Sequence, residues 1–247
     1  MTAVATEMTL GDRMKGYEKT ARTYLPRKTF TVIRMDGRGF SKFTRQMDKP
    51  FDMGFLDVMD RVTEALCAEV AGTRIAYTQS DEISLILSDH GDRTEPWLGG
   101  QVQKLVSITA GLATAHFNHL GPDSWFTNGP AVFDSRVFTL DSKAEVKNYL
   151  LWRQRDARRN AISMQARHHF SHKTLHGKTM GERLDMLTTG GVTPVTGRVF
   201  EGAVVYRDMF EVEGFDGPVM RHRWVTETAP AENIGDWLDD TDFLTVA

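Results

Sequence analysis

Hydrophobic and polar positions along this chain predict a strand, a helix, a hairpin and a second helix, in that order. Residues 29–35 are apolar and β-branched and end at an Asp-Gly turn dipeptide, which is typical of a core strand. Apolar residues at three- and four-residue steps predict a helix over 52–71. Two apolar segments, 74–78 and 83–87, flank a four-residue polar tip and predict a hairpin. The helical spacing returns over 98–119.

A further strand over 136–140 would complete a ferredoxin-like unit. Capping patterns at Ser142 and Thr179 then predict a long helix toward Phe170 and a shorter helix, and residues 197–228 predict a second hairpin. We therefore expect a single α+β domain whose core is an antiparallel sheet with packed helices. Its parts are a palm-like core over about 12–140, helical and β-hairpin additions over about 141–228, and an acidic tail over 229–247.

Composition supports an ordinary globular chain. It has 247 residues, of which 40% are hydrophobic and 26% charged, enough to bury a sizeable core. The single cysteine, Cys67, lies among apolar residues and is expected to be buried, and it excludes an intramolecular disulfide. The first ten residues lack the pattern of a secretion signal, and no apolar run approaches ~20 residues. These features predict a cytoplasmic protein without a membrane partner.

The net charge of −3 conceals a basic block. Residues 143–183 contain ten Lys or Arg residues against three Asp or Glu residues, which favours a polyanion-binding face over the alternative of a solvated helix surface. The block also contains four histidines, His168, His169, His172 and His176. Their spacing allows a metal site, but the neighbouring Arg and Lys residues favour contact with phosphates or bases.

Two short acidic motifs suggest phosphoryl transfer. Asp36 follows the first strand, and Ser80-Asp81-Glu82 lies at the tip of the first hairpin. If these strands pair, the carboxylates of Asp36 and Asp81 meet at one end of the sheet and could hold two Mg²⁺ ions. Side-chain alternation relaxes at a hairpin tip, so we expect that Glu82 also reaches the site.

Glycines and cations near these motifs suit a triphosphate. Gly37 and Gly39 would let the backbone approach the phosphates, and four cations could neutralise them. Those cations are Arg34, Arg38, Lys49 and Lys104. Each motif alone is common in turns and loops, so only their combination carries weight.

Together the motifs resemble the tRNA-His guanylyltransferase family of 3′-to-5′ nucleotidyltransferases, including its "like" proteins. The resemblance covers roughly residues 12–170. It rests on three segments in the same order: Ile33-Arg34-Met35-Asp36-Gly37-Arg38-Gly39-Phe40 with the Lys49-Pro50 that follows, Ala76-Tyr77-Thr78-Gln79-Ser80-Asp81-Glu82-Ile83-Ser84, and Tyr149-Leu150-Leu151-Trp152-Arg153-Gln154. Three separated matches are far more specific than any one of them.

The resemblance implies a polymerase-palm fold in which the 3′-hydroxyl of GTP attacks the activated 5′ end of a tRNA. It implies two Mg²⁺ ions on Asp36, Asp81 and the Gly37 carbonyl, with Glu82 as a further essential acid. ATP is a candidate for 5′ activation, and the assembly is expected to be a homotetramer. The implied nucleotide-binding residues are Asp36, Gly37, Arg38, Gly39, Phe40, Ser41, Lys49, Ser80, Asp81 and Lys104. The candidates for tRNA contact within the basic block are Lys147, Arg153, Arg155, Arg158, Arg159, Arg167, His172, Lys173 and Lys178.

Two departures leave the exact reaction open. Ser41 stands where the tRNA-His enzymes commonly have His, and Ala157-Arg158-Arg159-Asn160 replaces their His-Ile-Asn-Asn motif. Templated repair of the 5′ end of tRNA is therefore at least as well supported as guanosine addition to tRNA-His. Two alternatives from other classes are a palm-fold nucleotide cyclase and a catalytically silent RNA-binding module.

Overall fold

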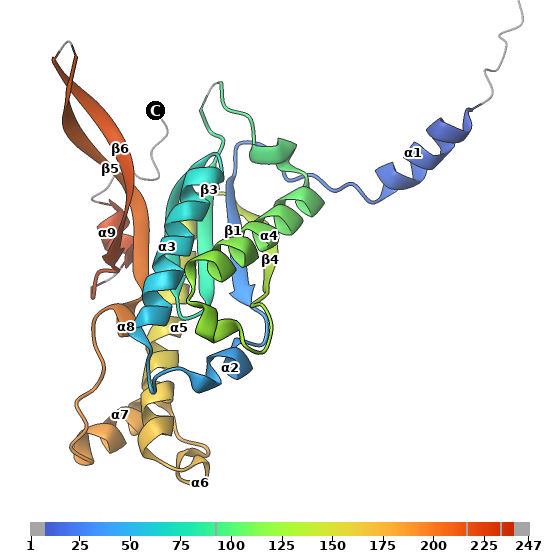
Figure 1. Ribbon diagram of the computed structural model, residues 1–247. Coiled ribbons are helices and arrows are strands. Elements are labelled where there is room, and N and C mark those ends of the chain that lie inside the picture. Colours follow the sequence, from blue (N-terminus) through green and yellow to red (C-terminus); the bar gives the residue numbers. More distant parts are fainter. Residues whose placement is uncertain (1–7, 92, 216, 233, 240–247) are drawn as a thin grey trace, which may run out of the picture.

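The structure, a computed structural model, describes residues 8–91, 93–215, 217–232 and 234–239 (Figure 1). Its centre is a six-stranded antiparallel sheet of order β4-β1-β3-β2-β5-β6. The strands are β1 (Phe30–Gly37), β2 (Thr73–Gln79), β3 (Glu82–Ser88), β4 (Phe133–Leu140), β5 (Ala203–Gly214) and β6 (Gly217–Thr228). The first four strands have the ferredoxin-like order, which confirms the predicted fold class.

Helices cover both faces of this sheet. The α-helices are α1 (Leu10–Thr20), α2 (Phe40–Phe43), α3 (Met53–Glu69), α4 (Val102–Leu120), α5 (Lys143–His169), α6 (His172–Leu175), α7 (Met180–Thr189), α8 (Arg198–Glu201) and α9 (Ile234–Asp239). Short 3₁₀ turns are η1 (Thr44–Gln46), η2 (Trp97–Gly100) and η3 (Asp123–Phe126). The predicted helices, strands and hairpins all form, most of them within a few residues of their expected bounds.

Alternation along the strands gives the sheet two apolar faces. Ile33 and Leu85 point toward α3 and α4, where they join a cluster that includes Phe117. Val32 and Ile86 point the other way, toward α5 and α9. Because both faces are covered, the central strands contain few polar residues until β1 and β3 reach their shared end.

The second hairpin extends the sheet. Residues 203–206 of β5 pair with 75–78 of β2, so the first hairpin lies at the centre of the sheet. The outer half of β5 and β6 projects beyond the helices (Figure 1). The segment after β6 returns to the core, where Ile234 and Leu238 are buried. The inner part of the expected acidic tail is therefore packed, and its remainder, 240–247, lies outside the described residues.

The long helix α5 spans two cores. Its Ser142 cap accepts a hydrogen bond from the Glu145 amide, as the sequence predicts. The first half packs on the sheet, and the second half forms a small separate core with α6 and α7 through Ile162, Leu175 and Leu187. This second unit hangs below the end of β1 (Figure 1).

Two differences from the expected elements have local causes. Helix α4 starts at Val102 rather than residue 98, because Gly99 and Gly100 adopt φ values of 64° and 68°, which cannot continue a right-handed helix. Helix α1 was not predicted; it buries none of its residues and projects away from the body (Figure 1). Cys67 is buried, as expected. Among the helices of the described residues, none has the length and apolar character needed to cross a membrane.

Candidate functional site

Strand register brings the two acidic motifs together. Asp36 pairs with Glu82 across β1 and β3, and the Gly37 amide donates a hydrogen bond of 3.1 Å to the Asp81 carbonyl. Asp36 and Asp81 therefore meet at one end of the sheet, next to the second half of α5. This confirms the juxtaposition that the sequence predicts.

The turn that carries Asp81 is tighter than expected. Gln79 pairs with Glu82, so only Ser80 and Asp81 form the turn. Ser80 has a φ of 48°, a left-handed conformation that favours glycine. Its hydroxyl donates a 3.0 Å hydrogen bond to Asp81 Oδ1. The strained serine thus fixes the orientation of a carboxylate at the site.

Ser80→Gly is expected to stabilise the fold by about 1 kcal/mol, because glycine adopts this φ without strain. It should also weaken divalent-metal binding by about 10-fold, because Asp81 loses the group that orients it. Urea unfolding and Mn²⁺ titration measure the two effects. Ser80→Ala is the matched control, since it removes the same hydroxyl but keeps the side chain that causes the strain. Equal stability of the glycine and alanine variants would contradict the strain argument.

Glu82 is already neutralised within the protein. Arg153 on α5 donates to both Glu82 oxygens at 2.7 Å, and Arg34 Nε lies 4.0 Å away. Arg153 Nη2 also donates a hydrogen bond of 2.8 Å to Asp156 Oδ2. Glu82 belongs to the last strand pair and not to a relaxed tip, so its side chain faces α5. Glu82 and Arg153 are therefore an internal ion pair, and because only 5% of Arg153 is exposed, it offers little surface for the predicted tRNA contact.

Asp36 and Asp81 carry negative charge without such a partner. Neither forms an ion pair with any described residue. Burial, followed by the nearby Asp36 carboxylate, raises the pKa of Asp81 to about 6. Burial and then Asp134, which pairs with Asp36 across β4, raise the pKa of Asp36. A cation between these two carboxylates would remove their repulsion.

Stability of the metal-free protein should depend on pH through Asp81. Its folded pKa of about 6 exceeds the ordinary value of 3.8, so the folded state favours the protonated acid. That stabilisation is present below about pH 4 and is lost as the pH rises through 6, at ~1.4 kcal/mol per pH unit. In EDTA, Asp81→Asn should therefore raise the Tm more at pH 7.5 than at pH 4.5. A Tm difference that does not change with pH would exclude this contribution.

The donors at this end of the sheet suit Mg²⁺. This ion prefers oxygen ligands and commonly binds one or two carboxylates together with waters and substrate phosphates. Asp36 and Asp81 provide two carboxylates without a cationic partner, and the Gly37 backbone lies beside them. In the part of the chain that the structure describes, no three His, Cys, Asp or Glu side chains converge as a self-sufficient metal site. The remaining ligands would therefore come from water and substrate.

An open cleft of about 870 Å³ lies between the carboxylates and the second half of α5. Its acidic side holds Asp36, Asp81 and Glu82, and its other side is largely basic. The residues that line it from α5 and from the segment that begins α7 are Asp156, Arg159, Asn160, Ser163, Met164, Arg167, Lys178, Thr179, Met180 and Arg183. Arg159 is bonded to Asp156, whereas Arg167 has no carboxylate partner among the described residues. The cleft can therefore hold a phosphate ligand between an acidic wall and a basic wall.

The loop after Asp36 divides its residues between two sides. Ser41 lines the cleft, whereas Arg38 and Gly39 line a second pocket beyond α2. The Phe40 side chain is a core residue with 3% exposure, so only its backbone could contact a nucleotide. A Cβ on Gly37 would lie 2.3 Å from the Phe40 ring. Packing against Phe40 therefore requires a glycine at position 37, a reason that the sequence argument missed.

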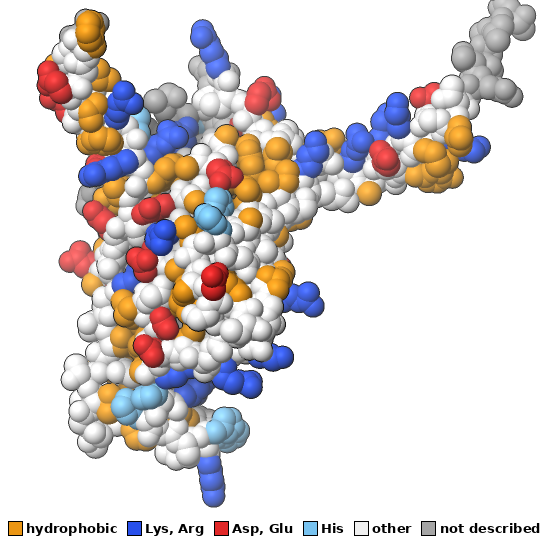
Figure 2. Space-filling model, viewed as in Figure 1, with side chains coloured by type: hydrophobic (Ala, Val, Ile, Leu, Met, Phe, Trp, Pro, Cys, Tyr) orange, Lys and Arg blue, Asp and Glu red, His pale blue; other side chains and the backbone are white. Residues whose placement is uncertain are grey.

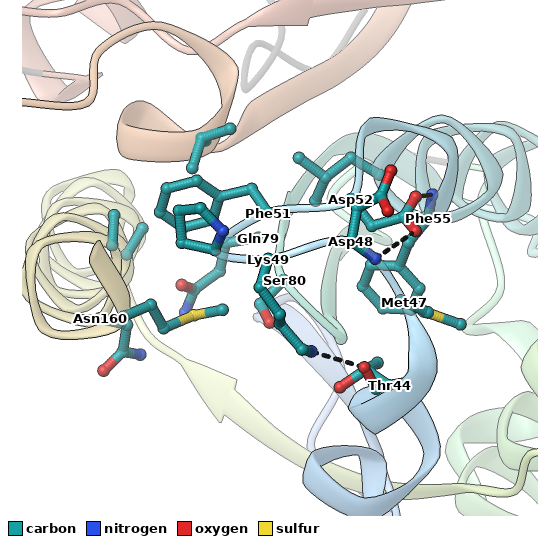
Figure 3. Close-up of a pocket in the computed structure, with 16 residues that line it drawn as sticks. Thr44, Met47, Asp48, Lys49, Phe51, Asp52, Phe55, Gln79, Ser80 and Asn160 are labelled. Carbon is teal, nitrogen blue, oxygen red and sulfur yellow. Dashed lines mark hydrogen bonds between the residues drawn. The ribbon is translucent and has the colours of Figure 1, made fainter. Parts of the chain in front are cut away.

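Lys49 and Lys104 have different placements. Lys49 lines a narrow groove of about 70 Å³ that shares Gln79 and Ser80 with the cleft, and its ammonium donates to the Thr44 carbonyl at 2.5 Å (Figure 3). Lys104 is exposed in the first turn of α4, whose start is bonded to the segment before β1. It therefore lies at the opposite end of β1 from Asp36, and one chain does not bring it to the cleft.

The predicted tRNA contacts separate in the same way. Lys147 pairs with Asp239 of α9, and Arg158 pairs with Glu201, so both serve the packing of the C-terminal segment. Arg155 is exposed outside the cleft. Arg159, Arg167 and Lys178 line the cleft, and His172 and Lys173 are exposed on α6.

Several cleft residues were not predicted. They are Asp156, Asn160, Ser163, Met164, Thr179, Met180 and Arg183. Those on α5 recur at steps of three and four residues that start at Asp156, so helical spacing could have identified them. Arg183 comes from α7 and donates to Ser163 at 2.8 Å, while its Nε has no hydrogen-bond partner in the described structure.

The sequence of this chain is similar to one known protein family and to several of its members. A family model described as tRNAHis guanylyltransferase matches residues 11–141, just over half of the chain. An uncharacterized protein of Acanthamoeba polyphaga mimivirus is 33% identical over 189 residues, covering 65% of this chain and 63% of the relative. The tRNA(His) guanylyltransferase of Neurospora crassa is 33% identical over 142 residues, covering 54% and 47%. The chain thus spans less than two thirds of these relatives.

Solved structures match over more of their length. A bacterial tRNA(His) guanylyltransferase-like protein in complex with ATP has a TM-score of 0.79 and 30% identity, with 89% of this chain and 91% of the other covered. The same kind of bacterial protein in complex with GTP also gives 0.79, with 28% identity and coverage of 96% and 99%. These matches cover most of this chain and therefore extend beyond residues 11–141.

Proposed function

Because this chain belongs to the tRNAHis guanylyltransferase family, we propose that it is a Mg²⁺-dependent nucleotidyltransferase that adds nucleotides from GTP to the 5′ end of tRNA. One observation carries the proposal: Asp36 and Asp81 meet without a cationic partner, opposite a basic wall, in a cleft large enough for nucleotide and RNA phosphates. The similar bacterial proteins in complex with ATP and with GTP support nucleotide binding by this chain.

Each part of the cleft has a role in this reaction. Asp36, Asp81 and the Gly37 carbonyl would hold two Mg²⁺ ions, which when bound lower the pKa of the attacking hydroxyl and stabilise the leaving group. The 3′-hydroxyl of GTP then attacks the 5′ phosphorus of the tRNA, and pyrophosphate or AMP leaves, depending on how that end is activated.

The protein itself supplies position and charge. Ser80 orients Asp81, and Arg153 neutralises Glu82 and fixes its position at the edge of the cleft. Arg167 and Arg183 provide positive charge on the opposite wall, where substrate phosphates would otherwise be repelled by the carboxylates. His172 and Lys173, exposed on α6, extend this surface, and Figure 2 shows His side chains gathered at the same end of the molecule.

Two specific reactions are compatible with this site. Templated 5′-end repair is favoured over guanosine addition to tRNA-His, because Ala157 and Arg158 serve internal packing where the tRNA-His enzymes carry a recognition motif. The 0.79 TM-scores with bacterial "like" proteins agree with this preference. We also propose a homotetramer, since Leu10, Met14 and Tyr17 on α1 are exposed and would gain cover from another copy. Light scattering tests the assembly.

Incorporation of α-labelled GTP tests the proposed reaction. The substrates are tRNA-His and a 5′-truncated tRNA of another identity, each with a 5′-monophosphate or triphosphate, incubated with Mg²⁺ and with or without ATP. Label in the truncated tRNA opposite a template C would support repair, and label confined to tRNA-His would support identity-directed addition. Absence of label from every RNA would exclude the transferase and leave a nucleotide cyclase or a silent RNA-binding module.

A further inference from the structure

A second pocket of about 630 Å³ lies on the other side of α2 from the catalytic cleft. Two segments form it, one from the loop after β1 through η1 and one from the turn before β4. The residues that line it are Arg38, Gly39, Phe40, Lys42, Phe43, Arg45, Gln46, Trp125, Asn128, Gly129, Pro130 and Ala131. Except for Arg38, Gly39 and Phe40, none of these has a role in the proposed reaction.

The pocket carries positive charge that the protein does not balance. Arg38, Lys42 and Arg45 are exposed, and none forms an ion pair with a described residue. No Asp or Glu occurs among the lining residues. Figure 2 shows a group of Lys and Arg side chains at the height at which Figure 1 labels α2. In the catalytic cleft, by contrast, Arg159 and Lys178 have carboxylate partners.

The walls of the pocket are fixed by hydrogen bonds and packing. The Arg38 amide donates to the Val132 carbonyl at 2.8 Å, and Gln46 Nε2 donates to the Trp125 carbonyl at 3.4 Å. Trp125 stacks on Phe117 with ring centroids 6.1 Å apart. The two segments are therefore held together before any ligand binds, and three cations lie on a preformed surface.

The pocket and the cleft share one turn of chain. Asp36 and Ser41 line the cleft, while Arg38 and Lys42 line the pocket, so neighbouring residues face opposite sides of α2. A ligand that reaches both sides must extend past this turn. An RNA strand whose 5′ end lies at Asp36 and Asp81 meets that requirement.

We propose that this pocket binds backbone phosphates of the RNA substrate, on the strand that leads away from the reacting 5′ end. The inference rests on the proposed function. Its polar side chains are three cations and the amides of Gln46 and Asn128, a set suited to phosphates and 2′-hydroxyls. Its Trp125 ring already stacks within the core, so recognition of the backbone is favoured over recognition of a free nucleotide base.

The double variant Lys42→Glu/Arg45→Glu tests the proposal without touching residues assigned to the nucleotide. Binding of a fluorescent 5′-monophosphorylated tRNA is measured by anisotropy over a salt series, and GTP binding is measured separately. We expect tRNA affinity to fall at least ~10-fold and the slope of log K against log [salt] to decrease by about 2, because two phosphate contacts are lost. GTP affinity and Tm should stay unchanged.

The matched control is Arg93→Glu/Arg221→Glu, which makes the same change in charge at two exposed positions outside the pocket. It should bind tRNA within about twofold of the parent, and Lys42→Ala/Arg45→Ala should lie between parent and the Glu variant. Unchanged tRNA affinity in the Glu variant, or lost GTP affinity with tRNA binding retained, would overturn the proposal.

Two different results would distinguish failure of the pocket assignment from failure of the proposed function. A parent protein that binds tRNA and transfers nucleotide, but whose tRNA affinity ignores Lys42 and Arg45, contradicts the pocket alone. A parent protein that neither binds tRNA nor labels it contradicts the proposed function, and the pocket assignment with it.

Discussion

Replacing Asp81 with asparagine is expected to reduce nucleotide transfer to RNA by about 10³-fold or more, equal to about 4 kcal/mol of transition-state stabilisation. Asparagine keeps the size of the side chain but removes one of two carboxylates that have no cationic partner. An amide oxygen binds Mg²⁺ more weakly than a carboxylate, and Asp36 alone would have to hold the metal charge. Tight tRNA binding should survive, because the phosphate contacts lie on other residues.

Single-turnover labelling of tRNA and anisotropy of tRNA binding measure the two effects on the same preparations. Asp185→Asn is a matched control, since Asp185 is exposed on α7 and does not line the cleft. It should keep near-parental activity. If Asp81→Asn retained more than about a tenth of the parental rate, Asp81 could not be an essential metal ligand.

Replacing Arg153 with methionine is expected to destabilise the protein by about 3–5 kcal/mol, because Glu82 would remain buried as an uncompensated charge. For a chain of this size the Tm should fall by roughly 6–20 °C. Calorimetry at neutral pH in EDTA measures the loss without any contribution from bound metal.

A second replacement, at Glu82, separates the cost of the unpaired charge from the cost of lost packing. Arg153→Met with Glu82→Gln should recover part of the lost Tm, because the buried carboxylate is replaced by a neutral amide, although Arg34 then loses its ion pair with Glu82. Arg159→Met is the exposed counterpart: Arg159 also bonds Asp156, but 63% of its side chain is exposed, so the cost should be below about 1 kcal/mol. Equal losses for the Arg153 and Arg159 variants would show that the buried pair has no special weight.

The fold and the meeting of Asp36 with Asp81 were predictable because both follow from alternation and strand order. Apolar runs defined β1 and the first hairpin, and their antiparallel pairing leaves one geometry for the two carboxylates. The partner of Glu82 was not predictable in the same way. Arg153 lies 71 residues away on α5, and which face of that helix meets the sheet depends on packing across the whole chain.

The packing role of Gly37 and Phe40 was not predictable in the same way either. Gly37 and Phe40 resemble a phosphate-binding loop, yet the ring packs directly over the glycine and both are buried. Helix α1 was missed although local signals were present: Thr9 caps it by accepting from the Asp12 amide, and Leu10, Met14 and Tyr17 recur at helical spacing although none of them is buried. Where tertiary packing decides a residue's role, short-range sequence patterns carry too little information.

Helix α5 gives the cleft a fixed scale. It runs without a break through 27 residues, or about 40 Å, and connects the sheet to the small core of α6 and α7. This one helix carries both Arg153, which binds Glu82, and Arg167, which lies on the far wall of the cleft. The distance between these two residues therefore cannot change unless the helix breaks. Helix α5 thus fixes the distance between the carboxylates at the end of the sheet and the basic residues of the second core. If the proposed reaction adds more than one nucleotide, the RNA would have to shift along the cleft after each addition, because this distance within the protein stays constant.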